Sequence, residues 1–196
     1  MTRIVVGISG ASGAIYGVRL LEVLGERPGI ETHLVMSGSA ETTIRYETGR
    51  DPSEVAALAD VTYGERDLAA SLASGTFRTA GMVIAPCSMR TLSGVANSSS
   101  DNLLVRAADV HLKERRPLVL VVRETPLHAG HLRLMADATA YGAVILPPVP
   151  GFLRSCGLLV SFSSTLRRFS IIARRSVSGV RKPKAPGLPM LSEMMS

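Results

Sequence analysis

Five short apolar runs, separated by segments of helical periodicity, constrain the fold of this chain more than any other feature. The runs span 3–9, 31–36, 81–86, 117–122 and 142–148. Each is continuously apolar and does not alternate with polar residues, which is typical of strands covered on both faces. The helical segments between them span 13–26, 38–48, 88–96, 101–115 and 127–140. This order predicts an α/β fold with a parallel sheet.

The segment 51–79 is longer than a simple crossover between two strands. We expect two small helices in it, "DPSEVAALAD" at 51–60 and "ERDLAASLAS" at 65–74. At 196 residues the chain is long enough for one domain with a substantial core.

The positive charge of the chain is concentrated after residue 151. Residues 152–196 hold eight basic residues and one acid, a net of +7, whereas residues 1–151 hold 14 basic and 15 acidic residues, a net of −1. The nearly neutral main body therefore gives no footprint for binding nucleic acid. Serine and proline are also frequent after Pro150, so we divide the chain into a domain at 1–151 and a basic, partly disordered tail at 152–196.

Two further absences bear on location and on metals. We find no 18-residue apolar span and no signal peptide, which predicts a cytoplasmic protein that does not cross a membrane. Cys87 and Cys156 form neither a zinc-site spacing nor a disulfide framework. His128 and His131 stand three apart on a predicted helix without a carboxylate at ligand spacing, so capping or surface roles are favoured over a metal.

A glycine-rich turn follows the first apolar run. In "GISGASGAIYG" the glycines Gly7, Gly10 and Gly13 have the spacing G-x-x-G-x-x-G, which differs from the G-x-G-x-x-G of dinucleotide enzymes. Glycines let the backbone approach a ligand closely, and the start of the next helix offers free N–H groups to an anion. A turn required only for packing is the alternative. We interpret the turn as a phosphate-binding site.

The end of the second predicted strand limits the size of the ligand. A dinucleotide site would place an acid there for a ribose diol, whereas this strand ends in "LVMSGSA" with Ser37. The glycine spacing and the missing acid both favour a ligand with one phosphate.

Polar residues also follow the third and fourth predicted strands. In "PCSMRTLSG", Ser88 and Thr91 stand at a helix start, where they bind a phosphate or only cap the helix. Cys87 is better explained as a buried thiol than as a nucleophile. Arg123 and Glu124 directly follow five apolar residues, and we interpret them as a phosphate clamp with an adjacent carboxylate rather than a structural ion pair.

Five longer stretches carry a family resemblance: "VGISGASGAIYGVRLLE", "ETHLVMS", "ASGTFRTAGMVIAPCSMRTLSGVA", "DNLLVRAADVHLKERRPLVLVVRETPLHAGHLRLM" and "GAVILPPVPGF". They closely resemble the UbiX-type flavin prenyltransferases, a family that includes accessory subunits of phenolic-acid decarboxylases. The resemblance covers about residues 2–152, and its motifs are far more specific than a glycine-rich turn alone.

This resemblance implies a Rossmann-like, flavodoxin-type three-layer αβα fold, bound reduced FMN and a homo-oligomer, a dodecamer with sites between subunits. Members of the family transfer a dimethylallyl group from dimethylallyl monophosphate to N5 and then C6 of the flavin, without a metal. Their product, prenylated FMN, serves UbiD-type decarboxylases of ubiquinone synthesis or aromatic-acid metabolism.

Functional residues of the family fall on matching positions of this chain. Its flavin contacts fall on Gly10, Ala11, Ser12, Gly13, Ser37, Ser88, Met89, Arg90, Thr91 and Arg123. Its catalytic residues fall on Ser12, Glu47 and Glu124, and its prenyl-phosphate contacts on Arg106, Lys113 and Arg123. In such a reaction cations stabilise the departing phosphate, while a carboxylic acid and a hydroxyl donate and accept protons. For Glu47, nothing in the local sequence decides between this role and a surface position.

The resemblance ends where the tail begins. The family continues with P-x-F-Y and an acidic helix start, whereas this chain reads "PGFLRSCGLLVSFSSTLRRFS", with Leu153 in place of the tyrosine. A basic position for the prenyl phosphate falls near Phe169, one residue from Arg168. Two explanations remain open, a shifted reading frame in the coding DNA and a divergent tail in which Arg168 binds that phosphate.

Prenyl transfer to reduced FMN is therefore the favoured function. A non-catalytic, FMN-binding accessory subunit of an aromatic-acid decarboxylase is the alternative. A flavoprotein decarboxylase of peptidyl cysteine is disfavoured, because such enzymes rely on an early histidine that "GASGAIYGVRLLE" lacks.

Overall fold

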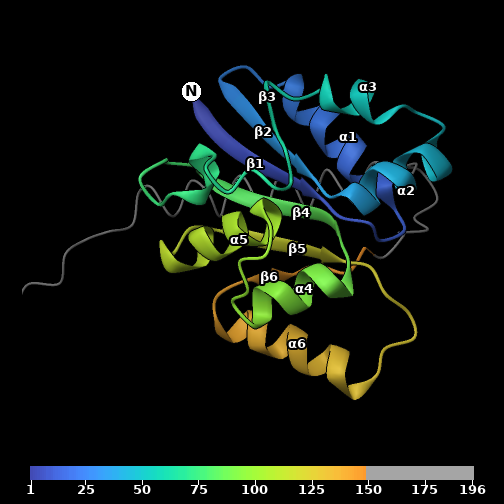
Figure 1. Cartoon of the computed structure of the whole chain (residues 1–196), viewed down its shortest axis with the longest axis vertical. Helices are drawn as coiled ribbons and strands as arrows, with labels where there is room; N and C mark the ends of the chain where they lie inside the picture. The colour runs from blue at the N-terminus through green and yellow to red at the C-terminus, as the bar shows by residue number, and fades with distance from the viewer. Residues whose placement is uncertain (149–196) are drawn as a thin grey trace, which may run out of the picture.

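A sheet of six parallel strands runs through the centre of the protein, with helices on both faces (Figure 1). The computed structural model describes residues 1–148. The strands are β1 (Thr2–Ile8), β2 (Ile30–Met36), β3 (Val61–Tyr63), β4 (Gly81–Cys87), β5 (Leu118–Val122) and β6 (Val144–Ile145). The helices are α1 (Ala14–Gly25), α2 (Gly38–Thr48), α3 (Pro52–Ala56), α4 (Met89–Ala96), α5 (Leu103–Lys113) and α6 (Ala129–Ala140), with a 3₁₀ turn η1 (Ser71–Ala73).

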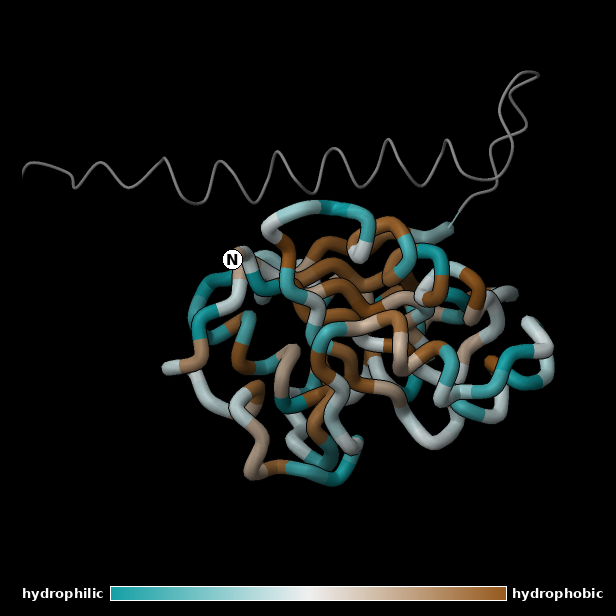
Figure 2. Tube along the Cα trace, turned by 90° about the horizontal axis from the view of Figure 1, so that it is seen from above, coloured by the Kyte–Doolittle hydropathy of each residue, from teal (hydrophilic) through white to brown (hydrophobic). Residues whose placement is uncertain are grey.

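Neighbouring side chains along each central strand enter two different hydrophobic cores. In β1, Ile4, Val6 and Ile8 pack on the side of α1 and α2, whereas Val5 packs on the side of α4, α5 and α6. Strands β4 and β5 alternate in the same way. Figure 2 shows the resulting band of hydrophobic residues, in brown, through the middle of the molecule. Burial of both faces explains why these strands are continuous apolar runs, and it confirms the predicted three-layer α/β fold.

Two expectations for the segment 51–79 were wrong. The sequence predicted no strand there, but β3 pairs with the edge of β2, from His33 opposite Val61 to Val35 opposite Tyr63. "ERDLAASLAS" is not an α-helix and forms turns and η1. Tertiary contacts override helix propensity here, because the Glu65 carbonyl oxygen accepts a hydrogen bond from the Leu103 N–H and its carboxylate binds the N–H of Gly38. The other small helix was correctly predicted as α3, and the last strand is shorter than the predicted 142–148.

The order of the strands locates the ligand-binding edge. The sheet runs β3-β2-β1-β4-β5-β6, and without the edge strand β3 it has the flavodoxin order. The chain winds outward from β1 toward β3 and then from β4 toward β6, so the switch in direction lies between β1 and β4. Ligands of open α/β sheets bind beyond the carboxyl ends of the strands at this switch point. None of the helices within residues 1–148 is long and apolar enough to cross a bilayer.

Helix α1 approaches the sheet closely at Gly17. A Cβ atom at this position would lie 2.3 Å from the carbonyl oxygen of Ala85 and 2.8 Å from the side chain of Ile8. Glycine therefore sets the height of α1 above β1 and β4, and with it the position of the turn that leads into α1.

A buried histidine joins α5 to the segment that precedes β4. His111 Nε2 lies 2.8 Å from Thr79 Oγ1, and Nδ1 lies 2.6 Å from the carbonyl oxygen of Ala107. Because a carbonyl oxygen only accepts, Nδ1 carries the proton and the Thr79 hydroxyl donates to Nε2. Burial is the main cause that lowers the pKa of His111 to about 4, so the ring is neutral at pH 7.

We expect Gly17→Ala to lower the free energy of unfolding by about 1–3 kcal/mol, because the added methyl group meets a backbone carbonyl that cannot rotate away. Gly25→Ala in the same helix is the matched control. Its Cβ would have no neighbour closer than 3.9 Å, and alanine favours a helix over glycine by about 0.5–1 kcal/mol. Urea denaturation measures both. Equal unfolding midpoints for the two variants would contradict the close seating of α1.

We also expect stability to fall as the pH is lowered from about 6.5 to about 4. Histidine in the unfolded chain has a pKa of about 6.5, above that of folded His111, so the unfolded chain binds more protons in this window. The contribution of His111 is complete above the window and is reduced by up to about 3 kcal/mol at its lower end. His33 acts in the same direction, because burial lowers its pKa too. Urea unfolding across this pH range should show a smaller loss for His111→Gln than for the unmodified protein, and an equal loss would rule out this role.

Candidate functional site

Two adjoining cavities lie at the carboxyl edge of the sheet, around the switch point. The larger, of about 560 Å³, is lined by the start of α2, by α4 and by the start of α5. The smaller, of about 430 Å³, is lined by the turn after β1, the start of α4 and the residues after β5. Gly10 and Ser88 line both cavities. Both volumes are in the range of small-molecule sites.

Ser9 holds the ends of β1 and β4 together between these cavities. Its buried Oγ donates to the carbonyl oxygen of Pro86 over 2.8 Å and accepts from the N–H of Ser88 over 2.7 Å. Regular pairing of the two strands ends at Gly7 and Ile84, so this side chain continues their connection into the turns. No individual role for Ser9 was predicted from the sequence. A serine directly before the glycines is the only local signal, and its partners lie 77 and 79 residues away.

The three glycines of the opening motif have different functions. Gly13 has φ of +95°, in the left-handed region that favours glycine. Gly10 lies against α2, where an added Cβ would be 2.3 Å from the Cβ of Ser39. Gly7 lies within β1, where its missing side chain leaves room for Leu104. Gly10 and Gly13 thus belong to a tight turn, whereas Gly7 allows a helix to pack against the sheet.

Glu47 occupies the start of α1. One of its carboxylate oxygens accepts hydrogen bonds from the N–H groups of Gly13 at 2.8 Å and Ala14 at 2.9 Å. The expectation that these N–H groups are free for an anion was therefore wrong. Helix α1 has neither a side-chain cap nor an acid in its first turn, so a carboxylate from the end of α2 neutralises its dipole. This contact brings Glu47 next to Ser12, although the two are 35 residues apart in sequence.

Hydroxyl groups from two helix starts face the larger cavity. Ser37 caps α2 by accepting from the N–H of Ala40 at 3.1 Å, and Ser88 caps α4 by accepting from the N–H of Thr91 at 3.2 Å. Capping of α4 by Ser88 was one of the two expected roles. A hydroxyl that accepts from the backbone keeps its own O–H as a donor. The hydroxyls of Ser88 and Thr91 lie 3.1 Å apart and one donates to the other, so this pair has one proton left for a ligand. Ser37, Ser88 and Thr91 all line the cavity together with Arg90, a donor set that suits a phosphate.

The smaller cavity collects residues that the sequence placed on three separate segments. It is lined by Gly10, Ala11, Ser12, Ser88, Met89, Arg123, Glu124 and Thr125. Arg123 follows β5 closely, because its N–H donates to the carbonyl oxygen of Cys87 at 3.1 Å. The thiol of Cys87 is buried and its pKa is raised by that burial, which agrees with the prediction of a buried thiol. A hydroxyl, a guanidinium and a carboxylate thus share one cavity at the switch point.

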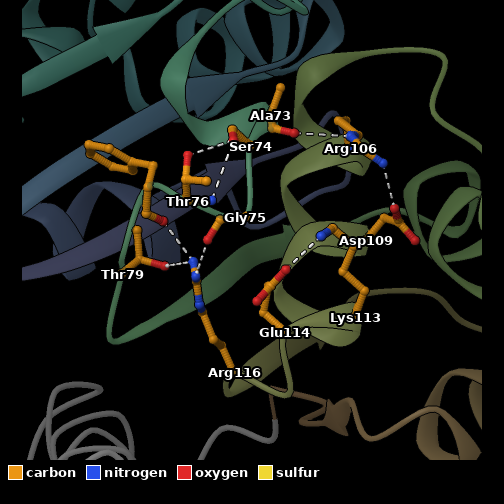
Figure 3. A network of polar contacts seen from close by, with 11 residues as sticks. Ala73, Ser74, Gly75, Thr76, Thr79, Arg106, Asp109, Lys113, Glu114 and Arg116 are labelled. Carbon is orange, nitrogen blue, oxygen red and sulfur yellow. Dashed lines mark hydrogen bonds and ion pairs between the residues drawn. The ribbon is translucent and has the colours of Figure 1, made fainter.

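Two of the expected phosphate ligands lie elsewhere in the chain. Arg106 and Lys113 are on α5 and line neither cavity. Arg106 donates to the carbonyl oxygen of Ala73 and to Asp109, and Lys113 pairs with Glu114 at 2.6 Å (Figure 3). Arg168 lies outside the described residues. Within residues 1–148 we find no group of three or more side chains that could hold a metal ion.

Comparison with known proteins identifies the family. The Flavoprotein family model matches residues 1–150. The flavin prenyltransferase UbiX of Escherichia coli is 66% identical over 152 residues, which are 78% of this chain and 80% of that protein. The flavin prenyltransferase UbiX of Thauera aromatica is 65% identical over 150 residues, 76% of this chain and 77% of that protein. The chain belongs to the UbiX family of flavin prenyltransferases.

A solved structure supports the same assignment. AnUbiX, crystallised in complex with FMN and dimethylallyl pyrophosphate, is 48% identical, with a TM-score of 0.81 over 88% of this chain and 92% of that chain. The family and fold expected from the sequence are confirmed, and FMN is the flavin of the family. The cavities fit this group. The hydroxyls and Arg90 suit its single phosphate, and Gly10, which has no side chain, lets the turn lie close to α2 without filling the cavities.

We expect Ser9→Ala to weaken FMN binding about tenfold and to cost about 1–3 kcal/mol of stability, because the buried N–H of Ser88 loses its acceptor. Flavin fluorescence titration and urea denaturation measure the two effects. Ser100→Ala, at an exposed position, is the control. FMN affinity equal to that of the control would show that Ser9 does not set the spacing of the two turns.

Proposed function

We propose that this protein is a flavin prenyltransferase that joins a dimethylallyl group from dimethylallyl monophosphate to N5 and C6 of reduced FMN. The observation that carries this proposal is the meeting of Ser12, Arg123 and Glu124 in one cavity, beside a second cavity suited to a phosphate. High identity to curated flavin prenyltransferases over the same residues supports it.

The larger cavity holds the phosphate end of the flavin in this proposal. The hydroxyl of Ser37 and one hydroxyl of the Ser88–Thr91 pair donate hydrogen bonds, and Arg90 supplies positive charge. The turn from Gly10 to Gly13 lets the backbone approach the ring. Reduced FMN supplies the electron-rich ring atoms that accept the dimethylallyl group.

Residues of the smaller cavity stabilise charge and transfer protons in this proposal. Breaking the allylic C–O bond of the substrate leaves negative charge on its phosphate, and the Arg123 guanidinium stabilises that charge. Glu124 holds or gives up a proton at its carboxyl group, and Ser12 at its Oγ, both within the same cavity. Glu47 is held beside Ser12 by the two N–H groups at the start of α1, where its carboxylate accepts a proton.

Arg106 and Lys113 serve the site of a neighbouring copy in this proposal. They lie outside both cavities of their own chain, so a second copy is needed to bring them to the prenyl phosphate. A related structure supports a homo-oligomer and, more specifically, a dodecamer. It is a dodecameric FMN-dependent UbiX-like decarboxylase from Escherichia coli, 43% identical, with a TM-score of 0.79 over 96% of this chain and all of that chain. In the cytoplasm the product would serve a UbiD-type decarboxylase.

One observation favours the second function, an FMN-binding accessory subunit without transferase activity. The matched region ends at about residue 150, and the family's tyrosine is replaced by Leu153 in the tail. Both explanations of the tail, including phosphate binding by Arg168, remain predictions. Sequencing the coding DNA distinguishes them, because an alternative frame after codon 151 should restore "FY" and an acidic helix start if the frame has shifted.

We expect the purified protein to convert FMN to prenylated FMN when dithionite and dimethylallyl monophosphate are added, as measured by the mass of the extracted flavin. Glu124→Gln should bind FMN normally and lose about 100-fold or more in turnover, because a general acid–base group contributes that much. Glu41→Gln, on the exposed side of α2, is the control. Unchanged FMN with the unmodified protein would favour the accessory subunit, and normal turnover by Glu124→Gln would remove Glu124 from the mechanism.

A further inference from the structure

The segment from the last residue of η1 to Thr79, here called the 73–79 loop, is fastened to the end of α5 by Arg116 (Figure 3). The guanidinium donates to the carbonyl oxygen of Gly75 at 2.6 Å, to that of Phe77 at 2.7 Å and to Thr79 Oγ1 at 3.4 Å. A planar fork of N–H donors is required to reach three acceptors of one loop at once. Arg116 is half-buried, and neither the family resemblance nor the cavities assign it a role.

The backbone directs Arg116 toward the loop. Arg115 has φ of +54°, its N–H donates to the carbonyl oxygen of Leu112, and the N–H of Arg116 donates to that of His111 at 2.7 Å. This pair of bonds is a Schellman motif, which ends α5 in a fixed direction. Arg115 therefore adopts, at a conformational cost, the left-handed position that glycine usually occupies at the end of a helix. The end of α5 is therefore a defined platform for the side chain of Arg116.

Thr79 secures the other end of the loop. Its Oγ1 accepts from Arg116 and donates to Nε2 of neutral His111, whose Nδ1 donates to the carbonyl oxygen of Ala107. This chain of hydrogen bonds joins the loop to the middle of α5. Phe77 adds a cation–π contact, because the guanidinium of Arg3 lies 4.7 Å from the centre of its ring.

The 73–79 loop contacts both cations that the proposed function assigns to the prenyl phosphate. The carbonyl oxygen of Ala73 accepts from Nε of Arg106 at 3.2 Å. Gly75 lies directly against the ion pair of Lys113 and Glu114, since a Cβ there would be 2.9 Å from Lys113 Nζ and 2.2 Å from the Glu114 carboxylate. One loop thus limits where Arg106 and Lys113 can place their charges.

We propose that Arg116 is a positioning residue for the prenyl phosphate, acting through the 73–79 loop on Arg106 and Lys113. This inference rests on the proposed function. The contacts to Ala73 and Asp109 use Nε and Nη1 of Arg106, and its Nη2 has no bond to a described residue. Lys113 has one partner, Glu114, and three N–H donors. Each cation is thus aimed by fixed contacts while donors remain for the phosphate.

Two variants move the cations by different routes. Arg116→Gln removes the fork and frees the loop. Gly75→Ala leaves Arg116 intact, but its methyl group displaces the ends of the flexible Lys113 and Glu114 side chains, without a left-handed φ to strain the backbone. Arg115→Gln is the matched control, because it removes the same charge one residue away from an exposed side chain with no bond to a described residue. Arg116→Lys keeps the charge but replaces the planar fork with a single ammonium group.

The first measurement is the affinity of dimethylallyl monophosphate for the full protein loaded with oxidised FMN, whose electron-poor ring does not accept the dimethylallyl group. Calorimetry should show about tenfold weaker binding for Arg116→Gln and Gly75→Ala, the scale of one hydrogen bond to a charged group. Arg116→Lys should be intermediate, and Arg115→Gln should stay within about twofold of the unmodified protein. FMN affinity and the thermal unfolding midpoint should be unchanged in Gly75→Ala.

The second measurement separates positioning from a general structural role. With reduced FMN, Arg116→Gln should lower kcat/KM for dimethylallyl monophosphate about tenfold or more while FMN affinity is unchanged, because the displaced cations contact the phosphate both when the substrate binds and when the phosphate departs. Equal affinities for Arg116→Gln and Arg115→Gln would overturn the inference, and so would equal losses of FMN and prenyl-phosphate binding. Prenyl-phosphate binding by an unmodified protein without turnover would instead overturn the proposed function alone. An unmodified protein that does not bind the substrate overturns both.

Discussion

The hydrogen bonds of Ser9 join β1 to β4 at the point where the sheet changes its winding direction. Parallel strands diverge beyond their last paired residues, and a ligand enters at that divergence. Here the gap has a fixed width, because one buried hydroxyl binds both the carbonyl oxygen of Pro86 and the N–H of Ser88. The glycine turn and the start of α4 are therefore held at a constant separation. The two cavities, which share Gly10 and Ser88, depend on it.

The polar side chains around this point serve both the helix starts and the cavities. The carboxylate of Glu47 supplies the negative charge that the start of α1 lacks, and the hydroxyls of Ser37 and Ser88 cap the two helices that face the larger cavity. Capping and ligand binding are compatible, since Ser37 keeps a proton to donate and the hydrogen-bonded pair of Ser88 and Thr91 keeps one between them. The same side chains that end the loops and begin the helices are thus available to the flavin phosphate.

Much of the fold could be predicted from the sequence, because strands buried on both faces leave a strong signal. The edge strand β3 could not be predicted in this way. Three residues are too few to show a hydrophobic periodicity, and the strand forms only because it pairs with β2. "ERDLAASLAS" was misassigned for a related reason: its helix propensity is outweighed by the bonds of Glu65 to Gly38 and Leu103, which come from other parts of the chain. No separate role for Arg116 was predicted from the sequence, because its acceptors lie about 40 residues away, in a loop with no sequence signature.

The sequence by itself determined the layered α/β fold, the family and the segments that end at the ligand edge, because apolar periodicity and motif order are local properties. Only the tertiary structure decided which of those segments meet. It placed Ser12, Arg123 and Glu124 in one cavity, bonded Glu47 to the start of α1 and left Arg106 and Lys113 outside both cavities. Such choices follow from strand order and helix packing, which bring together residues that no spacing in the chain relates.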